Sequence, residues 1–198
     1  MVVIAGPSRS RKSTVFSGDS FAVPWFNVDH WCAQVSGSYQ NISPQLRALG
    51  ARQCEAFVRE MIASASSFSV ETTLRGTHAL AQAREASAAG FLTVMNYIST
   101  ETLAVAIERV RRRGLAGGHS APPAVIAEIY EKSHQNLSHA VETFHQVNIF
   151  SSPQASVGEG GEWSLPRLEA RFVDQALLSL RKPVAPWLLR TPLLNQLE

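Results

Sequence analysis

A glycine, a lysine and a hydroxyl side chain are spaced along residues 6–14 in a way that suits phosphate binding. Gly6 is followed, after five residues, by Lys12 and Ser13. The rule for phosphate-binding loops is Gly, four residues, Gly, Lys and then Ser or Thr. In such a loop the backbone N–H groups form a nest for phosphate oxygens, the lysine reaches the terminal phosphates and the hydroxyl holds Mg²⁺. We therefore expect ATP and Mg²⁺ to bind here, with Ser13 as the Mg²⁺ ligand. The expected nucleotide contacts are Gly6, Pro7, Ser8, Arg9, Ser10, Arg11, Lys12, Ser13 and Thr14.

Arg11 stands where the rule has its second glycine. If the backbone needs a positive φ at this point, a non-glycine residue costs about 1–2 kcal/mol. The guanidinium could crowd the phosphate or donate to it. A chance turn that contains a glycine and several basic residues is the alternative interpretation of the segment.

Two acidic residues follow short apolar segments, as side chains at the ligand-binding edge of a sheet do. Asp29 ends a strand predicted from Trp25 to Val28, and Glu71 ends one predicted from Phe68 to Val70. In open α/β sheets, ligands bind outside the carboxyl ends of the strands. The pattern favours a place for both carboxylates at that edge, while a helix-capping or turn-capping role stays open for each.

The rest of the chain alternates apolar runs with helical patterns, which is typical of an α/β fold. We predict a P-loop NTPase-type parallel sheet with helices on both faces, formed by residues 1–151, and a C-terminal extension, residues 152–198, packed on it. The further expected helices are 43–65, 77–90, 101–113 and 122–144, and the further expected strands are 2–5, 91–98 and 147–150, the last being the final core strand.

The ordered motifs resemble the zeta toxin family of P-loop kinases over residues 1 to about 151. The blocks that carry the resemblance are the loop 6–14, Asn27-Val28-Asp29, Glu71-Thr72-Thr73-Leu74 with Gly76, Arg109 to Arg113 followed by Gly117-Gly118-His119 and Pro122, and then Tyr130, Ser133, Asn136 and Leu137. Members of the related broad group phosphorylate a sugar hydroxyl of UDP-N-acetylglucosamine with ATP and Mg²⁺. The resemblance implies an ATP-dependent kinase with a sugar-nucleotide acceptor, and an antitoxin protein as a candidate partner.

The resemblance also implies roles for particular side chains. Asp29 corresponds to the proposed base for the sugar hydroxyl, and Glu71, Thr72 and Thr73 correspond to the block that holds the acceptor. Arg109 and Arg113 correspond to lid arginines that neutralise the transferring phosphate beside Lys12. A solvated basic helix end is the alternative for the two arginines.

Several family positions differ in this chain. Arginines that family members carry before the tyrosine are replaced by Ala127, Glu128 and Ile129, and Lys132 replaces another. Together with Arg11, these changes support a second hypothesis. In it the chain keeps the fold but acts as a nucleotide- or partner-binding module without turnover.

Composition narrows the class of protein. The hydrophobic fraction is 45%, the charged fraction 17% and the formal net charge +2. This charge is too small to demand a nucleic-acid or membrane partner, even with the cluster around Arg111. Cys32 and Cys54 lack metal-ligand spacing, and the histidines have no matching cysteine or carboxylate, so we expect no metal other than Mg²⁺. No segment has the pattern of a targeting signal or a membrane span, which makes a cytoplasmic protein the default expectation.

Overall fold

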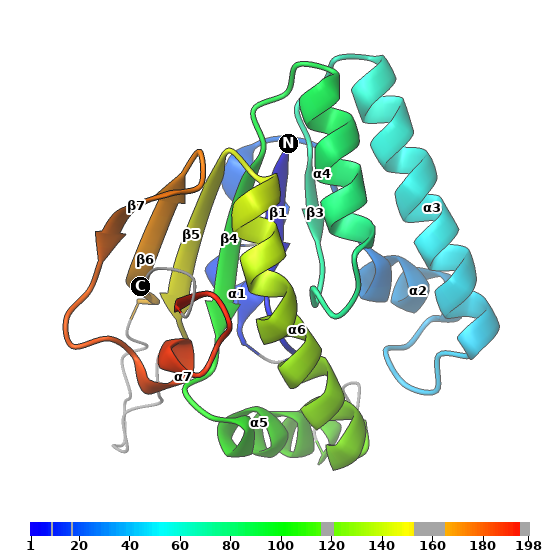
Figure 1. The fold of residues 1–198 in the computed structure, drawn as a ribbon. Helices are drawn as coiled ribbons and strands as arrows, with labels where there is room; N and C mark the ends of the chain where they lie inside the picture. Colours follow the sequence, from blue (N-terminus) through cyan, green and yellow to red (C-terminus); the bar gives the residue numbers. More distant parts are fainter. Residues whose placement is uncertain (9, 17, 116–120, 153–164, 195–198) are drawn as a thin grey trace.

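A sheet of seven strands runs through the described part of the chain, in the order β2-β3-β1-β4-β5-β6-β7 (Figure 1). The computed structural model describes residues 1–8, 10–16, 18–115, 121–152 and 165–194. The strands are β1 Val2–Ala5, β2 Trp25–Asn27, β3 Ser69–Glu71, β4 Val94–Ser99, β5 Gln146–Ser151, β6 Arg167–Val173 and β7 Ala176–Leu180. The pairs from β2 to β5 are parallel, so the carboxyl ends of these five strands share one edge.

The last two strands correct the sequence prediction. The predicted α/β class is confirmed, but the sheet is mixed, because β6 and β7 pair antiparallel beyond β5. The expectation that the strand at 147–150 is the final one was wrong. The segment that forms β6 alternates arginine and glutamate with apolar residues. Its polar residues are also typical of a loop, so the segment is recognised as a strand only when its partner strand is known.

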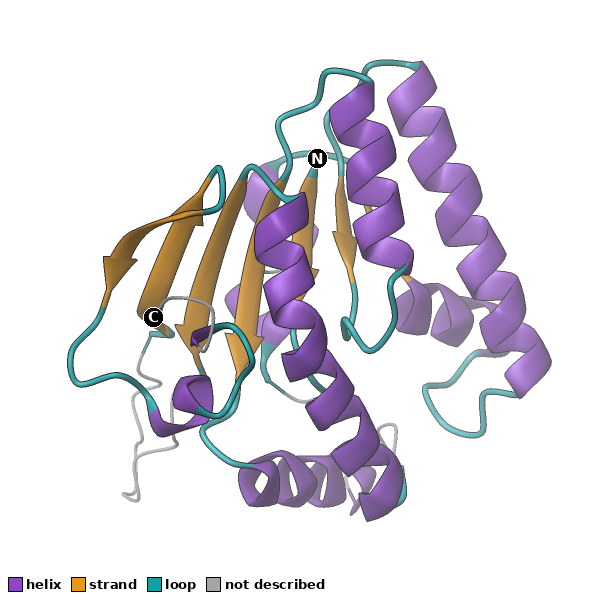
Figure 2. Ribbon diagram, in the orientation of Figure 1, coloured by secondary structure: helices purple, strands orange, loops and turns teal. Residues whose placement is uncertain are grey.

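Helices cover the two faces of the sheet very unequally (Figure 2). The helices are α1 Lys12–Val15, α2 Val28–Ser36, α3 Pro44–Ala63, α4 His78–Ala88, α5 Leu103–Leu115, α6 Pro123–Thr143 and α7 Pro186–Leu189, and a 3₁₀ turn covers Gly18–Phe21. The long helices α3, α4 and α6 lie on one face, whereas α1, a single turn, lies on the other (Figure 1). Phe16 at the end of α1 packs edge-on against Phe150 of β5.

Side-chain caps fix two of the helix starts. The Ser43 hydroxyl accepts a hydrogen bond from Leu46 N, and Pro44 is the first helical residue, as predicted for α3. The Asn27 side chain accepts from His30 N at 3.0 Å and starts α2, which the sequence did not predict. The expected strand therefore ends one residue early, and Asp29 lies in the first turn of a helix.

The main core lies between the sheet and the long helices. Alternate residues of the central strands, such as Val3, Tyr97 and Ile149, are fully buried there against Leu80 of α4 and Leu137 of α6. The intervening residues Ile4 and Ile98 are buried as well, so the central strands are covered on both faces. No helix in the described ranges combines the length and the apolarity that crossing a bilayer demands.

The C-terminal segment enters this core through Trp187. The indole is 2% exposed and its Nε1 donates to Ser151 Oγ at 2.8 Å. Its ring stacks on His134 with the centroids 5.2 Å apart. His134 in turn pairs through Nε2 with Ser99 Oγ at 2.8 Å. These contacts join α7, α6 and the end of β4 into one buried cluster.

Replacing Trp187 with alanine tests how firmly the C-terminal segment belongs to the fold. Deletion of a buried tryptophan removes packing and an indole hydrogen bond, so we expect a loss of about 3–5 kcal/mol in the free energy of unfolding. Urea denaturation would measure it. Leu189→Ala, on the same helix at a side chain that is 56% exposed, is the control. Equal effects of the two variants would contradict the packing of α7 described here.

The buried imidazole of His134 predicts a loss of stability in acid. Burial lowers its pKa from 6.5 to about 4, so the folded protein keeps the ring neutral while the unfolded chain takes up a proton. Stability is therefore complete above pH 6.5 and falls as the pH drops toward 4, by about 3 kcal/mol in total. The measurement is the free energy of unfolding of wild type and His134→Gln across this range.

His139→Gln, at an exposed histidine of the same helix, should retain the wild-type acid slope. If His134→Gln retained the full slope as well, the loss would have to come from another group.

Candidate functional site

The turn that joins β1 to α1 lies where the sheet changes direction. After β1 the chain crosses to β2, which lies on one side of β1 in the sheet. After β3 it crosses to β4, which lies on the other side of β1. The neighbouring strands β1 and β4 therefore lie where the connections change direction. Ligands of open α/β sheets bind at such a point, outside the carboxyl ends. Gly6 opens the turn with φ 136°. A Cβ at this position would lie 2.0 Å from Ile98 O, so only glycine lets the turn lie against the end of β4.

Arg11 has the backbone conformation that the missing glycine would adopt. Its φ and ψ are 70° and 28°, in the left-handed region, and it precedes the first residue of α1. A non-glycine residue pays about 1–2 kcal/mol there. The left-handed conformation expected of the second glycine is thus present in spite of the substitution. Partial burial lowers the pKa of the Arg11 guanidinium.

Lys12 lies over the turn. Its side chain is 7% exposed, and Nζ donates to Gly6 O at 2.9 Å and to Pro7 O at 3.1 Å. Nζ also lies 3.9 Å from Glu71 Oε1. The ammonium group is therefore positioned within the curve of the loop, beside a carboxylate.

Glu71 reaches the loop from the neighbouring strand. Glu71 pairs with Ile4 in the register of β1 and β3, and this pairing places Glu71 at the carboxyl edge of the sheet. Its Oε2 accepts a hydrogen bond from Ser13 Oγ at 2.8 Å. Sequence reasoning assigned Glu71 to the acceptor. The role predicted for Glu71 toward the acceptor stays a prediction, and the contacts of its carboxylate are with Lys12 and Ser13, the two residues expected to hold phosphate and metal.

Ser10 carries a hydroxyl whose bonding is incomplete. The residue is fully buried, and its Oγ has no hydrogen-bond partner among the described residues. This Oγ lies 3.1 Å from the place where a Cβ on Gly6 would be. Since buried polar atoms are nearly always paired, an orphan in a phosphate-binding turn indicates a hydroxyl placed for a ligand.

The segment after Glu71 is fastened to α6. Thr72 N donates to Ile4 O, and Thr72 Oγ1 accepts from Leu74 N at 3.1 Å. Leu74 has a φ of 58° and is fully buried, and Asn136 Nδ2 holds its carbonyl at 2.9 Å. Thr73 is half-buried between them. The block thus forms a rigid turn at the same edge of the sheet as the loop.

Asp29 lies at the outer end of the site in an ion pair. Its Oδ1 accepts from Arg47 Nη1 at 3.0 Å, and the two side chains are 57% and 36% exposed. The helix cap is Asn27, which pairs with Glu71 in the register of β2 and β3. Asp29 therefore follows the strand end next to that of Glu71, and its carboxylate does not cap α2.

Of the two arginines predicted to act as lid residues, Arg109 of α5 is the one whose side chain the structure describes. Its Nη1 donates to Ser152 Oγ at 2.8 Å. Burial lowers its pKa, the charge of Arg11 lowers it further, and Glu101 opposes both effects. Neither Ser152 nor Glu101 was singled out in the sequence. Glu101 follows the end of β4, a position that could have indicated it, whereas Ser152 carries no local signal.

The structure describes only some of the remaining predicted residues. Arg9 and the glycine segment at 116–120 are not described, and nothing is described of the Arg113 side chain. Ser8 is half-buried, Pro7 is buried and Thr14 is exposed in the first turn of α1. In the described part of the chain, no group of three or more His, Cys, Asp or Glu side chains is arranged to hold a metal ion.

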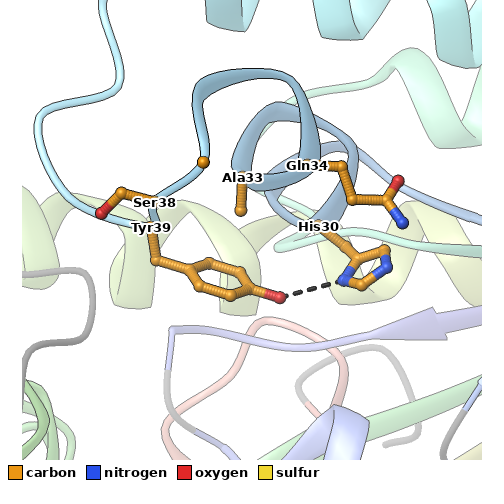
Figure 3. Close-up of a pocket in the computed structure, with 6 residues that line it drawn as sticks. His30, Ala33, Gln34, Ser38 and Tyr39 are labelled. Atoms are coloured by element: carbon orange, nitrogen blue, oxygen red, sulfur yellow. Dashed lines mark hydrogen bonds between the residues drawn. The ribbon is translucent and has the colours of Figure 1, made fainter.

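A small open pocket begins one residue beyond Asp29 (Figure 3). It has a volume of about 170 Å³ and is lined by His30, Ala33, Gln34, Gly37, Ser38 and Tyr39. Figure 3 shows the Tyr39 hydroxyl directed at the His30 ring, with Oη 2.9 Å from Nδ1. The Trp25 ring lies 5.2 Å from the same imidazole. Because whole small-molecule sites measure roughly 300–1,000 Å³, this pocket suits one ring of a larger ligand.

Solved structures share this architecture at low sequence identity. A chain of the PezAT chromosomal toxin–antitoxin system of Streptococcus pneumoniae matches with a TM-score of 0.56 at 14% identity, over 76% of this chain and 68% of that chain. A chain of the AvrRxo1-ORF1:-ORF2 complex with ATP matches with a TM-score of 0.66 at 13% identity, over 91% of this chain and 60% of that chain.

A candidate kinase of Chloroflexus aurantiacus matches with a TM-score of 0.52 at 15% identity, over 67% of this chain and 77% of that chain. No protein-family model matches the sequence, and a comparison with curated proteins finds no match. At these identities the likeness concerns the fold. This chain is similar in fold to these toxin–antitoxin and kinase structures, which confirms the predicted α/β fold of the P-loop NTPase type.

Proposed function

We propose that this chain is an ATP- and Mg²⁺-dependent phosphotransferase that passes the γ-phosphate of ATP to a hydroxyl of a small molecule. A sugar nucleotide such as UDP-N-acetylglucosamine is the proposed acceptor. The observation that carries the proposal is the convergence of Lys12, Ser13 and Glu71 on one curved turn at the sheet's switch point. Phosphoryl transfer needs mainly positioning and charge around the moving group, and these side chains supply both.

The residues present fit a nucleotide with its metal. The turn between Gly6 and Lys12 offers backbone amides in a curve that a Cβ on Gly6 would disrupt, and the buried Ser10 hydroxyl has no partner among the described residues. The hydroxyl of Ser13 and the carboxylate of Glu71 are hard oxygen donors 2.8 Å apart, which suits Mg²⁺. When bound, Mg²⁺ would neutralise charge on the β- and γ-phosphates. The neighbouring complex solved with ATP supports the choice of nucleotide.

Different side chains act on the nucleotide and on the acceptor. Lys12 leaves its carbonyl partners to hold the terminal phosphates, and Arg109 with Arg113 adds charge from α5. Asp29 leaves Arg47 to accept the proton of the acceptor hydroxyl, and the turn of Thr72 and Thr73 lines the space between. The pocket beside His30 and Tyr39 would hold one ring of the acceptor.

The toxin–antitoxin neighbours suggest a protein partner as well. One neighbour comes from the PezAT toxin–antitoxin system, and another was solved as a complex of two chains. We propose that an antitoxin-like protein binds this chain. Co-purification of the chain with the product of an adjacent gene would support such a partner.

A binding module without turnover is the second candidate, and the ion pair of Asp29 with Arg47 favours it. The guanidinium lies 3.0 Å from one of the two carboxylate oxygens, Oδ1, so that this oxygen already has a partner other than a substrate hydroxyl. The two functions differ in one measurement. The kinase releases or transfers the γ-phosphate at a steady rate, whereas the module binds ATP and leaves it intact.

Lys12→Ala should abolish phosphate transfer. Removal of one charged donor at a transition state typically lowers kcat about 10²–10³-fold. The loss of ATP turnover by purified protein, measured as phosphate release with and without acceptor, tests this. A Lys12→Ala variant with wild-type turnover would contradict the role assigned to the loop. Lys132→Ala, at an exposed lysine paired with Glu128 on α6, is the matched control.

Asp29→Asn should separate catalysis from binding. A general base typically contributes about 10²–10⁴-fold to the rate. We therefore expect kcat to fall by that range while ATP affinity, measured by calorimetry, stays near the wild-type value. If ATP affinity fell together with kcat, Asp29 would instead be acting on the fold of α2. Arg47→Gln, which frees the Asp29 carboxylate, should not lower the rate in the same way.

A further inference from the structure

The sheet ends in a strand whose outer edge has no neighbouring strand in the described part of the chain. This strand, β7, is the last in the strand order and pairs on one side only, with β6. Figure 1 shows β7 at the left margin of the sheet, away from the long helices α3, α4 and α6. An edge of this kind presents a row of unpaired N–H and C=O groups that can pair with another strand.

The sequence of β7 lacks the residues that usually keep a sheet edge from pairing. The strand reads Ala-Leu-Leu-Ser-Leu, with no charged residue and no proline. Four of its five residues, 176–179, are exposed. Charged side chains and prolines are common means of blocking an exposed edge. The apolar composition of β7 therefore indicates an edge that another strand covers.

A β-bulge makes Leu178 the most exposed leucine of this edge. Arg171 pairs with Ser179 and Phe172 pairs with Leu177, so that Leu178 has no partner on β6. The Leu178 side chain is 65% exposed, compared with 37% for Leu177. An extra residue in a strand bends the strand locally and redirects a side chain. A leucine in this position is stabilised when another apolar side chain covers it.

The charges beside β7 favour one partner and one direction of pairing. Asp174 lies in the turn before the strand, and Arg181 and Lys182 follow the strand. All three side chains are exposed, and none of them joins an ion pair in the described part of the chain. When two β7 strands pair antiparallel about Leu178, Asp174 of each chain lies opposite Lys182 of the other. A parallel pair would instead place like charges together, which destabilises a sheet.

We propose that β7 pairs antiparallel with β7 of a second copy of this chain, so that the two sheets join across a two-fold axis at Leu178. The same strand then forms both sides of the contact, as a two-fold interface requires. Ala176 lies opposite Leu180 of the other copy, and the two Leu178 side chains meet at the axis. A contact of this small size belongs to the weak and transient class, so the dimer forms at high protein concentration. No residue of the phosphate-binding site takes part, and the dimer is independent of the proposed function.

Leu178→Lys tests the contact at the axis. The substitution removes an apolar contact and places two like charges next to each other, so we expect the dimer to weaken about 10-fold or more. Sedimentation equilibrium from low-micromolar to near-millimolar protein measures the dimer. Leu92→Lys, at a leucine before β4 that is also 65% exposed, is the matched control and should dimerise as wild type does. An unchanged melting temperature shows that both variants remain folded.

A mixture of two variants tests the two-fold geometry. Leu178→Glu alone should be as monomeric as Leu178→Lys, since like charges again meet at the axis. An equimolar mixture of the two should form a heterodimer, because opposite charges then lie next to each other. Lys182→Glu places an acidic residue opposite Asp174 and should weaken the dimer about 2–5-fold.

Each outcome supports or overturns a part of the proposal. Wild type that stays monomeric at near-millimolar concentration overturns the pairing, and so does a dimer that Leu178→Lys leaves intact. A mixture of Leu178→Lys and Leu178→Glu that stays monomeric overturns the contact at the axis, and a dimer insensitive to Lys182→Glu overturns the antiparallel direction. If the β7 amides become protected from hydrogen exchange only when a different protein is bound, that protein covers the edge, and the pairing of two copies is overturned.

Discussion

The close approach of Gly6 to the end of β4 is the constraint on which the rest of the site depends. With no side chain at residue 6, the turn after β1 lies against the Ile98 carbonyl, where a Cβ would be only 2.0 Å away. This contact fixes the entrance of the loop, and the left-handed Arg11 fixes its exit. Between them, Ser10 N donates to Pro7 O at 3.3 Å, which stabilises the bend of the turn before any ligand binds. Preorganisation of this kind lowers the cost of binding a highly charged group.

The parallel register carries this constraint across the sheet. Ile4 pairs with Glu71, and Asn27 pairs with the same residue from the other side. The strand ends therefore bring the loop, Glu71 and the first turn of α2 to one edge. Beneath that edge, the cluster of Tyr97, His134 and Trp187 supports the end of β4. Through Trp187 and Ser151, the C-terminal segment contributes to the rigidity of the same region.

Much of the fold could be predicted from the sequence because its signals are local. The run before Gly6, the Ser43-Pro44 start of α3 and the Pro122-Pro123 start of α6 each predict an element without knowledge of its neighbours. The strands β6 and β7 could not be predicted in this way. The alternating polar residues of β6 become a strand only through pairing with β5, and β7 then pairs with β6. Helix α2 was missed because the predicted strand was extended through Val28 to Asp29, although the side chain of Asn27 caps a helix that begins at Val28.

The part of the site that could be predicted also has local signals. The residues of the loop are contiguous, so their spacing could be interpreted directly. Glu71 and Ser13 are 58 residues apart in the chain, and their contact depends on the register of β1 and β3. The contact of Arg109 with Ser152 depends on the packing of α5 against the end of β5. No spacing in the sequence encodes such contacts.

A crystal structure with ATP and Mg²⁺ bound tests the central claim most directly. The account predicts the triphosphate in the curve between Gly6 and Ser13, with Lys12 Nζ moved from the Gly6 and Pro7 carbonyls onto phosphate oxygens. A structure at saturating ATP in which Lys12 keeps both carbonyls, with the nucleotide bound elsewhere, would contradict it.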